Sequence, residues 1–119
     1  MKGQTICWTL LLSFIAMMLT MEVYAEVIRD PDGRIHRSKA AVQHFREANP
    51  CPATRKLGMG RCSGFVVDHM IPLCANGVDG MPNLQWQSEH VSKIKDKDEL
   101  RLCTKKITLE AFKQTWDIK

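Results

Sequence analysis

Apolar positions recur at helical spacing in three segments of this chain. Residues 39–48 carry an apolar side between charged positions, so a helix is predicted there, with Ser38 as its N-cap and Pro50 beyond its end. A charged helix is predicted over residues 88–103, and a shorter amphipathic helix over residues 109–116. These segments account for the helical part of the expected fold.

Other segments have the composition of strands and turns. Residues 65–71 are apolar and rich in β-branched side chains, which predicts a strand, and residues 83–86 predict a second, short strand. The turn-rich segment 75–82 connects the two. Residues 26–37 are expected to form a hairpin around the strong turn sequence at 30–33. Strands and helices together predict a small α+β protein.

The N-terminal 25 residues have the features of a signal peptide. Lys2 provides a positive start, an apolar run follows, and the small residue Ala25 fits a cleavage site before Glu26. The alternative is an uncleaved N-terminal anchor, although the apolar run is short for a membrane span. Cleavage leaves residues 26–119 as one domain, secreted or periplasmic, with a modest core.

Four cysteines remain after such a cleavage, which suits a disulfide-stabilised exported domain. Three pairings are possible, and we favour Cys51–Cys62 together with Cys74–Cys103. The first pair would close a glycine-containing loop, and the second would tie the loop after the first strand to the end of the long helix. A zinc–thiolate site is the alternative, although the spacing lacks a C-x-x-C pair.

The adjacent residues Asp68 and His69 lie inside the apolar strand segment. Imidazole is suited to deprotonating water near neutral pH, and phosphodiester hydrolysis also needs a cation that neutralises phosphate charge. Neighbouring strand residues point to opposite faces, unless a bulge or strand end relaxes that geometry. The structural alternative is an exposed aspartate beside a core histidine. The net charge of +4 is compatible with a polyanionic partner.

Several elements around this pair resemble a branch of the HNH nuclease superfamily. They are the run FVVDHMIPL at residues 65–73, the loop at Gly77, NLQWQ at residues 83–87 and KIKD at residues 93–96. The resemblance covers roughly residues 50–103 and implies a ββα-metal core. The expected fold is therefore a disulfide-stapled core of this kind, with an N-terminal hairpin and helix before it and a C-terminal helix after it.

The resemblance also implies roles for single residues. Asp68 matches the first metal ligand, His69 the general base, and Asn83 the asparagine whose amide braces the loop between the strands. For Asn83, an ordinary turn asparagine is the alternative interpretation.

The chain departs from the family at the third signature position, where Ser92 stands in place of a metal-binding histidine. Asp96 is the expected substitute ligand, with His90 as an alternative from one turn earlier. An oxygen-rich site favours Mg²⁺ or Mn²⁺, with Ni²⁺ or Zn²⁺ as alternatives. The lysines at 93, 95 and 97 are expected to point away from the metal or toward phosphate. Arg61 and Lys93 are predicted phosphate contacts.

The resemblance implies an exported, metal-dependent endonuclease that hydrolyses phosphodiester bonds in DNA, with RNA as an alternative substrate. Two other functions fit the same residues. One is a non-catalytic nucleic-acid-binding domain with a degenerate HNH site, and the other is a structural exported domain in which the Asp68-His69 pair is fortuitous.

Overall fold

The computed structural model describes residues 27–58 and 60–119, which form a small α+β fold. The predicted signal peptide and its cleavage site fall outside the described residues. The elements in chain order are α2 (Lys39–Ala48), β1 (Phe65–His69), η1 (Leu73–Ala75), η2 (Met81–Asn83), β2 (Leu84–Ser88), α3 (Glu89–Cys103) and α4 (Leu109–Thr115). The predicted order of helices and strands from α2 to α4 is confirmed.

The helices begin where the sequence indicated. The hydroxyl of Ser38 accepts a hydrogen bond from the backbone N–H of Ala41, and Ser88 accepts one from Val91 in the same way. Each bond satisfies a backbone donor that the first helical turn leaves free. Among the helices of the described ranges, none is both long enough and apolar enough to cross a membrane.

The two strands pair antiparallel, with Phe65 opposite Ser88 and His69 opposite Leu84. Strand β1 ends two residues earlier than predicted because Asn83 takes over the next backbone groups. The Asn83 carbonyl accepts from the N–H of Met70 at 2.7 Å, and its side-chain Oδ1 accepts from the N–H of Ile71 at 2.9 Å. The connection between the strands is therefore anchored at the point where pairing stops.

The predicted N-terminal hairpin is present but short: beyond its turn, the N–H of Asp30 donates to the carbonyl of Arg34 at 2.8 Å, and the N–H of His36 donates to the carbonyl of Ile28 at 2.9 Å. The backbone N–H of Gly33 donates to the carbonyl of Asp30 at 2.8 Å, and a single bridge joins Arg29 to Ile35. Most side chains on both sides of this turn are exposed, so little packing energy is available to extend the pairing.

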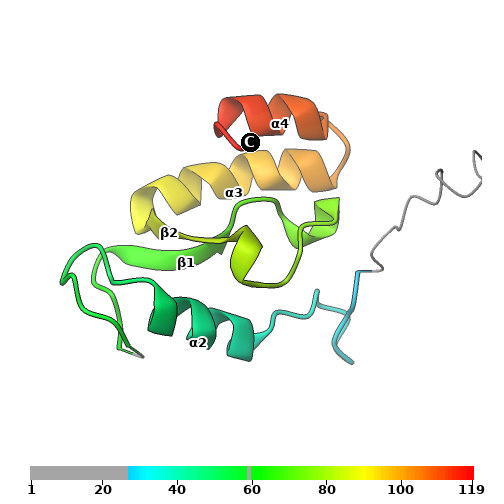
Figure 1. The fold of residues 1–119 in the computed structure, drawn as a ribbon. Helices are drawn as coiled ribbons and strands as arrows, with labels where there is room; N and C mark the ends of the chain where they lie inside the picture. Colours follow the sequence, from blue (N-terminus) through cyan, green and yellow to red (C-terminus); the bar gives the residue numbers. More distant parts are fainter. Residues whose placement is uncertain (1–26, 59) are drawn as a thin grey trace, which may run out of the picture.

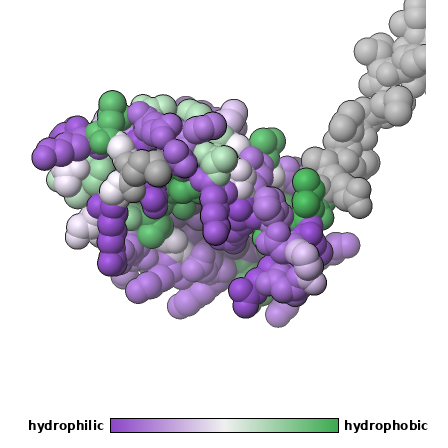
Figure 2. Space-filling view, turned by 90° about the horizontal axis from the view of Figure 1, so that it is seen from below, coloured by the Kyte–Doolittle hydropathy of each residue, from purple (hydrophilic) through white to green (hydrophobic). Residues whose placement is uncertain are grey.

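The elements form layers (Figure 1). Helix α3 packs against both strands, α4 lies on the outer side of α3, and α2 lies on the opposite side of the strand pair. Phe45 of α2 meets Trp86 of β2 edge to face, with ring centroids 5.8 Å apart. Phe112 of α4 is completely buried. Seen from the α2 side, the surface is mainly hydrophilic, with apolar side chains in small groups (Figure 2).

Both predicted disulfides are present. Cys51–Cys62 closes the loop before β1, and Cys74–Cys103 joins η1 to the last residue of α3. All four cysteines of the described ranges are therefore paired, and the zinc–thiolate alternative is wrong because no thiolate remains to bind the metal.

Gly77 lies where the connection between the strands folds back onto itself. A Cβ at this position would overlap the carbonyl oxygen of Ile71 and lie 2.8 Å from Nδ2 of Asn83. Both groups are fixed by hydrogen bonds to each other, so neither can move away without losing them. Glycine is thus required here for space.

We expect Gly77→Ala to lower the free energy of unfolding by about 3 kcal/mol or more, because the added methyl group must break the contacts of Asn83. Gly80→Ala is the matched control, since its Cβ would meet only Val78 and Pro82 at ordinary contact distances. Chemical denaturation of both variants and the wild type measures the effect. Equal stability of the two variants would contradict the prediction.

Candidate functional site

His69 is the last residue of β1, and only 8% of it is exposed. Its ring Nε2 lies 3.0 Å from Oδ1 of Asp79. An ionised carboxylate can only accept, so Nε2 carries the proton of the neutral ring and Nδ1 keeps its lone pair. No hydrogen-bond partner for Nδ1 is found among residues 27–58 and 60–119. The ring is therefore held at one nitrogen and free at the other.

Asp79 belongs to the connection between the strands and was interpreted from the sequence only as part of a turn. Its Oδ2 accepts a hydrogen bond of 2.6 Å from the backbone N–H of Ser38, the N-cap of α2. The carboxylate is thus held between the histidine ring and the start of a helix. Two donors on its two oxygens fix both its position and the orientation of the ring.

Asp68 points to the other face of β1, as strand geometry requires. Its Oδ2 lies 2.6 Å from Nζ of Lys95, which belongs to α3. The two adjacent residues therefore serve different sides of the strand pair. His69 faces the side of α2 and the connection, and Asp68 faces α3.

Lys95 is the most buried charged residue of the described chain, with 1% of it exposed. Its ammonium donates to Asp68 Oδ2 at 2.6 Å, to the backbone carbonyl of His69 at 2.5 Å and to Glu99 Oε1 at 2.7 Å. The ring of Phe112 lies 5.8 Å from the same nitrogen. Lys95 was expected to point away from the metal or toward phosphate, and the structure instead places its ammonium on Asp68, the expected metal ligand.

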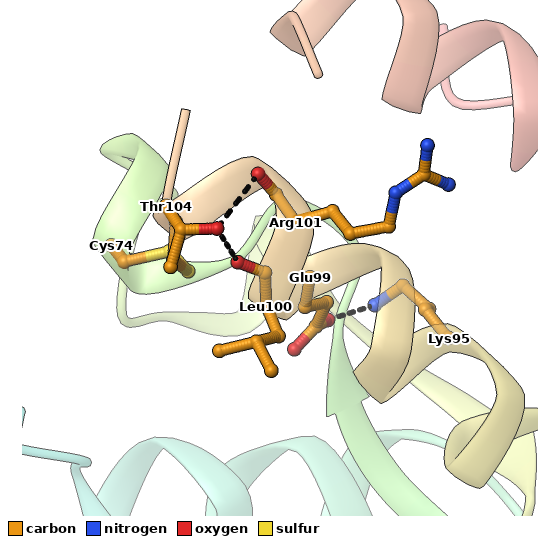
Figure 3. Close-up of a disulfide and its surroundings, with 7 residues drawn as sticks. Cys74, Lys95, Glu99, Leu100, Arg101 and Thr104 are labelled. Carbon is orange, nitrogen blue, oxygen red and sulfur yellow. Dashed lines mark hydrogen bonds and ion pairs between the residues drawn. A yellow bond between two sulfur atoms is a disulfide. The ribbon is translucent and has the colours of Figure 1, made fainter. Parts of the chain in front are cut away.

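Glu99 completes this network from the next turn of α3. Figure 3 shows the ion pair of Glu99 with Lys95 and, near the end of the same helix, the disulfide that Cys74 forms with Cys103. Lys95, Glu99 and Cys103 follow one another at intervals of four residues, so they lie along one side of the helix. The Cys74–Cys103 bridge therefore fixes the end of α3 that carries the carboxylate.

The rotation of α3 decides which predicted ligands reach the site. Asp96 would have to face inward to be the expected ligand, whereas the buried residues of α3 are Lys95 and Leu102, with Ser92 and Glu99 partly buried. This inward side has the spacing i, i+3, i+7, i+10, which turns Asp96 outward. Residues 95 and 96 lie three and four positions after Ser92, so helical spacing allows either of them to share its side. Packing against the strands placed Lys95 inward.

Asp96 and His90 are exposed, and the structure does not bring them together with Asp68. Within the described ranges, no group of three His, Cys, Asp or Glu side chains is arranged to hold a metal ion. An ammonium group contacts the oxygens of Asp68 and Glu99 that a divalent cation would need. In this arrangement, the donor set does not fit the metal that the family resemblance implies.

Asn83 makes the bracing contacts expected from the sequence. Its amide nitrogen donates to the carbonyls of Ile71 and Val78 at 2.8 and 2.9 Å, and its amide oxygen accepts from the N–H of Ile71. These bonds tie together both halves of the connection that presents Asp79 to the histidine. Asn83 thus positions the His69–Asp79 pair without contacting the ring.

A small hollow of about 80 Å³ opens beside the pair. Its walls include Asp68, His69 and Glu99, and the guanidinium-bearing residue Arg37 also lines it. Arg37 was interpreted from the sequence only as the last residue of the predicted hairpin, because no motif marks it. Arg61 and Lys93 are exposed and do not line this hollow; Arg61 precedes β1 by four residues, and Lys93 lies in α3.

Burial raises the pKa of the Glu99 carboxyl above its usual value of 4.5, and the hydrogen bond and charge of Lys95 only partly oppose this shift. The folded protein therefore binds the Glu99 proton more tightly than the unfolded chain does. The contribution to stability is fully present below pH 4.5 and is lost as the pH rises through the raised folded value.

We expect Glu99→Gln to remove this pH dependence, because glutamine has no proton to release. The free energy of unfolding of the wild type, relative to the variant, should fall as the pH rises above 4.5 and through the raised pKa of the folded state. Denaturant titrations at several pH values measure the difference. Glu110→Gln on α4 is the control and should keep the pH dependence of the wild type. The prediction is contradicted if the free energy of unfolding of the wild type, relative to that of Glu99→Gln, rises with pH.

The chain matches no protein-family model, and comparison with the curated proteins and with the solved structures finds no match. The function of the site is therefore inferred from its own geometry.

Proposed function

We propose that the protein is an exported HNH-like phosphodiesterase that cleaves DNA internally, with RNA as an alternative substrate. The observation that carries this proposal is the His69–Asp79 pair, held at 3.0 Å beside a hollow at the end of β1. The order β1, connection, β2, α3 is the order expected for a ββα core, and Asn83 braces the connection within it. Both features support an HNH-like interpretation.

His69 has the arrangement of a general base. In the proposed reaction, Nδ1 takes a proton from a water molecule, the water oxygen attacks phosphorus, and the bond from phosphorus to the leaving oxygen breaks. Asp79 keeps the other nitrogen protonated and stabilises the imidazolium that forms, as a carboxylate does for the histidine of hydrolase triads. Burial of the pair limits competition from bulk water for these hydrogen bonds.

The hollow suits a phosphate group better than a base, because its volume is about 80 Å³. Arg37 can provide charge to a phosphate there, and guanidinium groups bind phosphate oxygens in a bidentate manner. Arg61 lies in the loop before β1 and Lys93 lies in α3, so neither residue is at the hollow, and we propose that they contact more distant phosphates of a polymer. This arrangement and the net charge of +4 support a nucleic-acid substrate.

Export to the periplasm or beyond is part of this proposal. Its support is the pair of disulfides, which form and persist in oxidising compartments, together with the signal-peptide pattern of residues 1–25.

A nucleic-acid-binding domain without hydrolysis is the second candidate. The observation that favours it is the ion pair of Asp68 with Lys95, because Asp68 is the residue to which the family resemblance assigns a metal. An aspartate neutralised by a buried ammonium is not free to bind a catalytic cation in that arrangement. Retained binding without cleavage would separate this candidate from the first.

We expect His69→Ala to lower the rate of nicking of supercoiled plasmid by about 10²- to 10⁴-fold, because the general base is lost. Asp79→Asn should lower the rate by roughly 10- to 100-fold, because it disturbs the orientation and the tautomer of the ring. The rates are measured with the purified protein in Mg²⁺, in Mn²⁺ and in EDTA. His44→Ala, on the exposed side of α2, is the matched control and should leave nicking unchanged.

Full nicking activity in folded His69→Ala would exclude the assigned base. If the wild type binds DNA in fluorescence anisotropy but nicks it under none of the three conditions, the second candidate replaces the first. Circular dichroism of each variant separates loss of the base from loss of the fold.

A further inference from the structure

Three oxygens, two from adjacent residues of β1 and one from α3, converge on one nitrogen atom beside His69. They are Oδ2 of Asp68, the carbonyl oxygen of His69 and Oε1 of Glu99, all within 2.7 Å of the Lys95 ammonium. An ammonium group has three donors, so each of them is used. Both carboxylates keep about a fifth of their side chains accessible, whereas Lys95 has almost none.

An ammonium and a divalent cation require the same oxygens. Divalent cations such as Mg²⁺ and Ca²⁺ bind carboxylate and carbonyl oxygens at 2.0–2.6 Å, which brings them to the position that the ammonium fills. Positive charge at this position stabilises two neighbouring carboxylates that would otherwise repel each other. The position therefore needs a cation, and Lys95 provides one that is covalently attached to the chain.

The surroundings of Lys95 hold the ammonium in place. Phe112, which is completely buried, covers the nitrogen from α4, and the Cys74–Cys103 bridge fixes the end of α3 one turn beyond Glu99. For the ammonium to leave, it would have to lose three charge-assisted or carbonyl hydrogen bonds together with its contact to the aromatic ring. Loss of one partner from a buried ion pair is strongly destabilising, so the ammonium is held at this position.

We propose that Lys95 is the resident cation of this site, that it excludes divalent metal from Asp68, and that its removal creates a divalent-cation site formed by Asp68, Glu99 and the carbonyl of His69. This inference concerns the site of the proposed function, but its test measures cation binding and not cleavage. Failure of the proposed role of Lys95 is therefore distinguishable from failure of the proposed nuclease function.

Calorimetric titration with Mn²⁺ tests the proposal on the protein purified after export. Asp68→Asn should bind Mn²⁺ to the same extent as the wild type, because Asp68 holds no metal in the wild type. Lys95→Met nearly keeps the length of the side chain without its charge, and it should bind one Mn²⁺ at a site that the wild type lacks. The double variant Lys95→Met/Asp68→Asn should lose this gain. Lys97→Met, with the same charge change at an exposed position of α3, is the matched control and should gain nothing.

If the wild type binds Mn²⁺ and Asp68→Asn does not, the proposal is overturned. If Asp96→Ala also fails to bind Mn²⁺, the ligand set expected from the sequence is restored. A folded Lys95→Met protein that gains no binding would also overturn it. If Lys95→Met does not fold alone, recovery of its circular dichroism spectrum on refolding in Mn²⁺, but not in EDTA, supports the proposal. Failure to recover in either condition counts against it.

Discussion

A buried positive charge holds the two central layers of this protein together. The ammonium of Lys95 joins a carboxylate and a backbone carbonyl of β1 to a carboxylate of α3, and it lies almost completely out of water. A charge in that environment is tolerated only when its partners are close and well directed, so its contacts constrain how α3 lies across the strand pair. The rotation of that helix, and with it the set of side chains that meets β1, follows from this requirement.

The connection between the strands is built on a second constraint, which is the close approach of Asn83 to Gly77. The Asn83 amide bonds both halves of the connection, and only a glycine leaves room for that approach. The connection is thereby fixed tightly enough to hold Asp79 against the ring of His69. Without the Asn83 contacts, Asp79 would no longer be held in place, and the ring of His69 would no longer be oriented.

Together the two constraints give β1 different chemistry on its two faces. One face carries a histidine oriented by a carboxylate and the start of α2, and the other carries an aspartate neutralised by Lys95. We propose hydrolysis for the first face and a built-in cation for the second. The Cys74–Cys103 bridge lies beside both, because it ties the connection after β1 to the end of α3. Oxidation of this pair thus bears directly on the geometry of the site, and this relation is consistent with export to an oxidising compartment.

Local signals in the sequence were sufficient for the helices and strands of this fold, whereas the bracing role of Asn83 was expected only from the family resemblance. Ser38 and Ser88 cap their helices because capping depends on residues three positions away, and the disulfides follow from cysteines placed at the ends of neighbouring elements. The partners of His69 and Asp68 could not be derived in this way. Asp79 lies 10 residues from His69 and reads as a turn residue, and Lys95 and Asp96 have equal claims to face inward until the helix is packed. A helix of the same sequence can be rotated by one position without changing its local energy, and only the contacts with β1 and α4 decide between the two orientations.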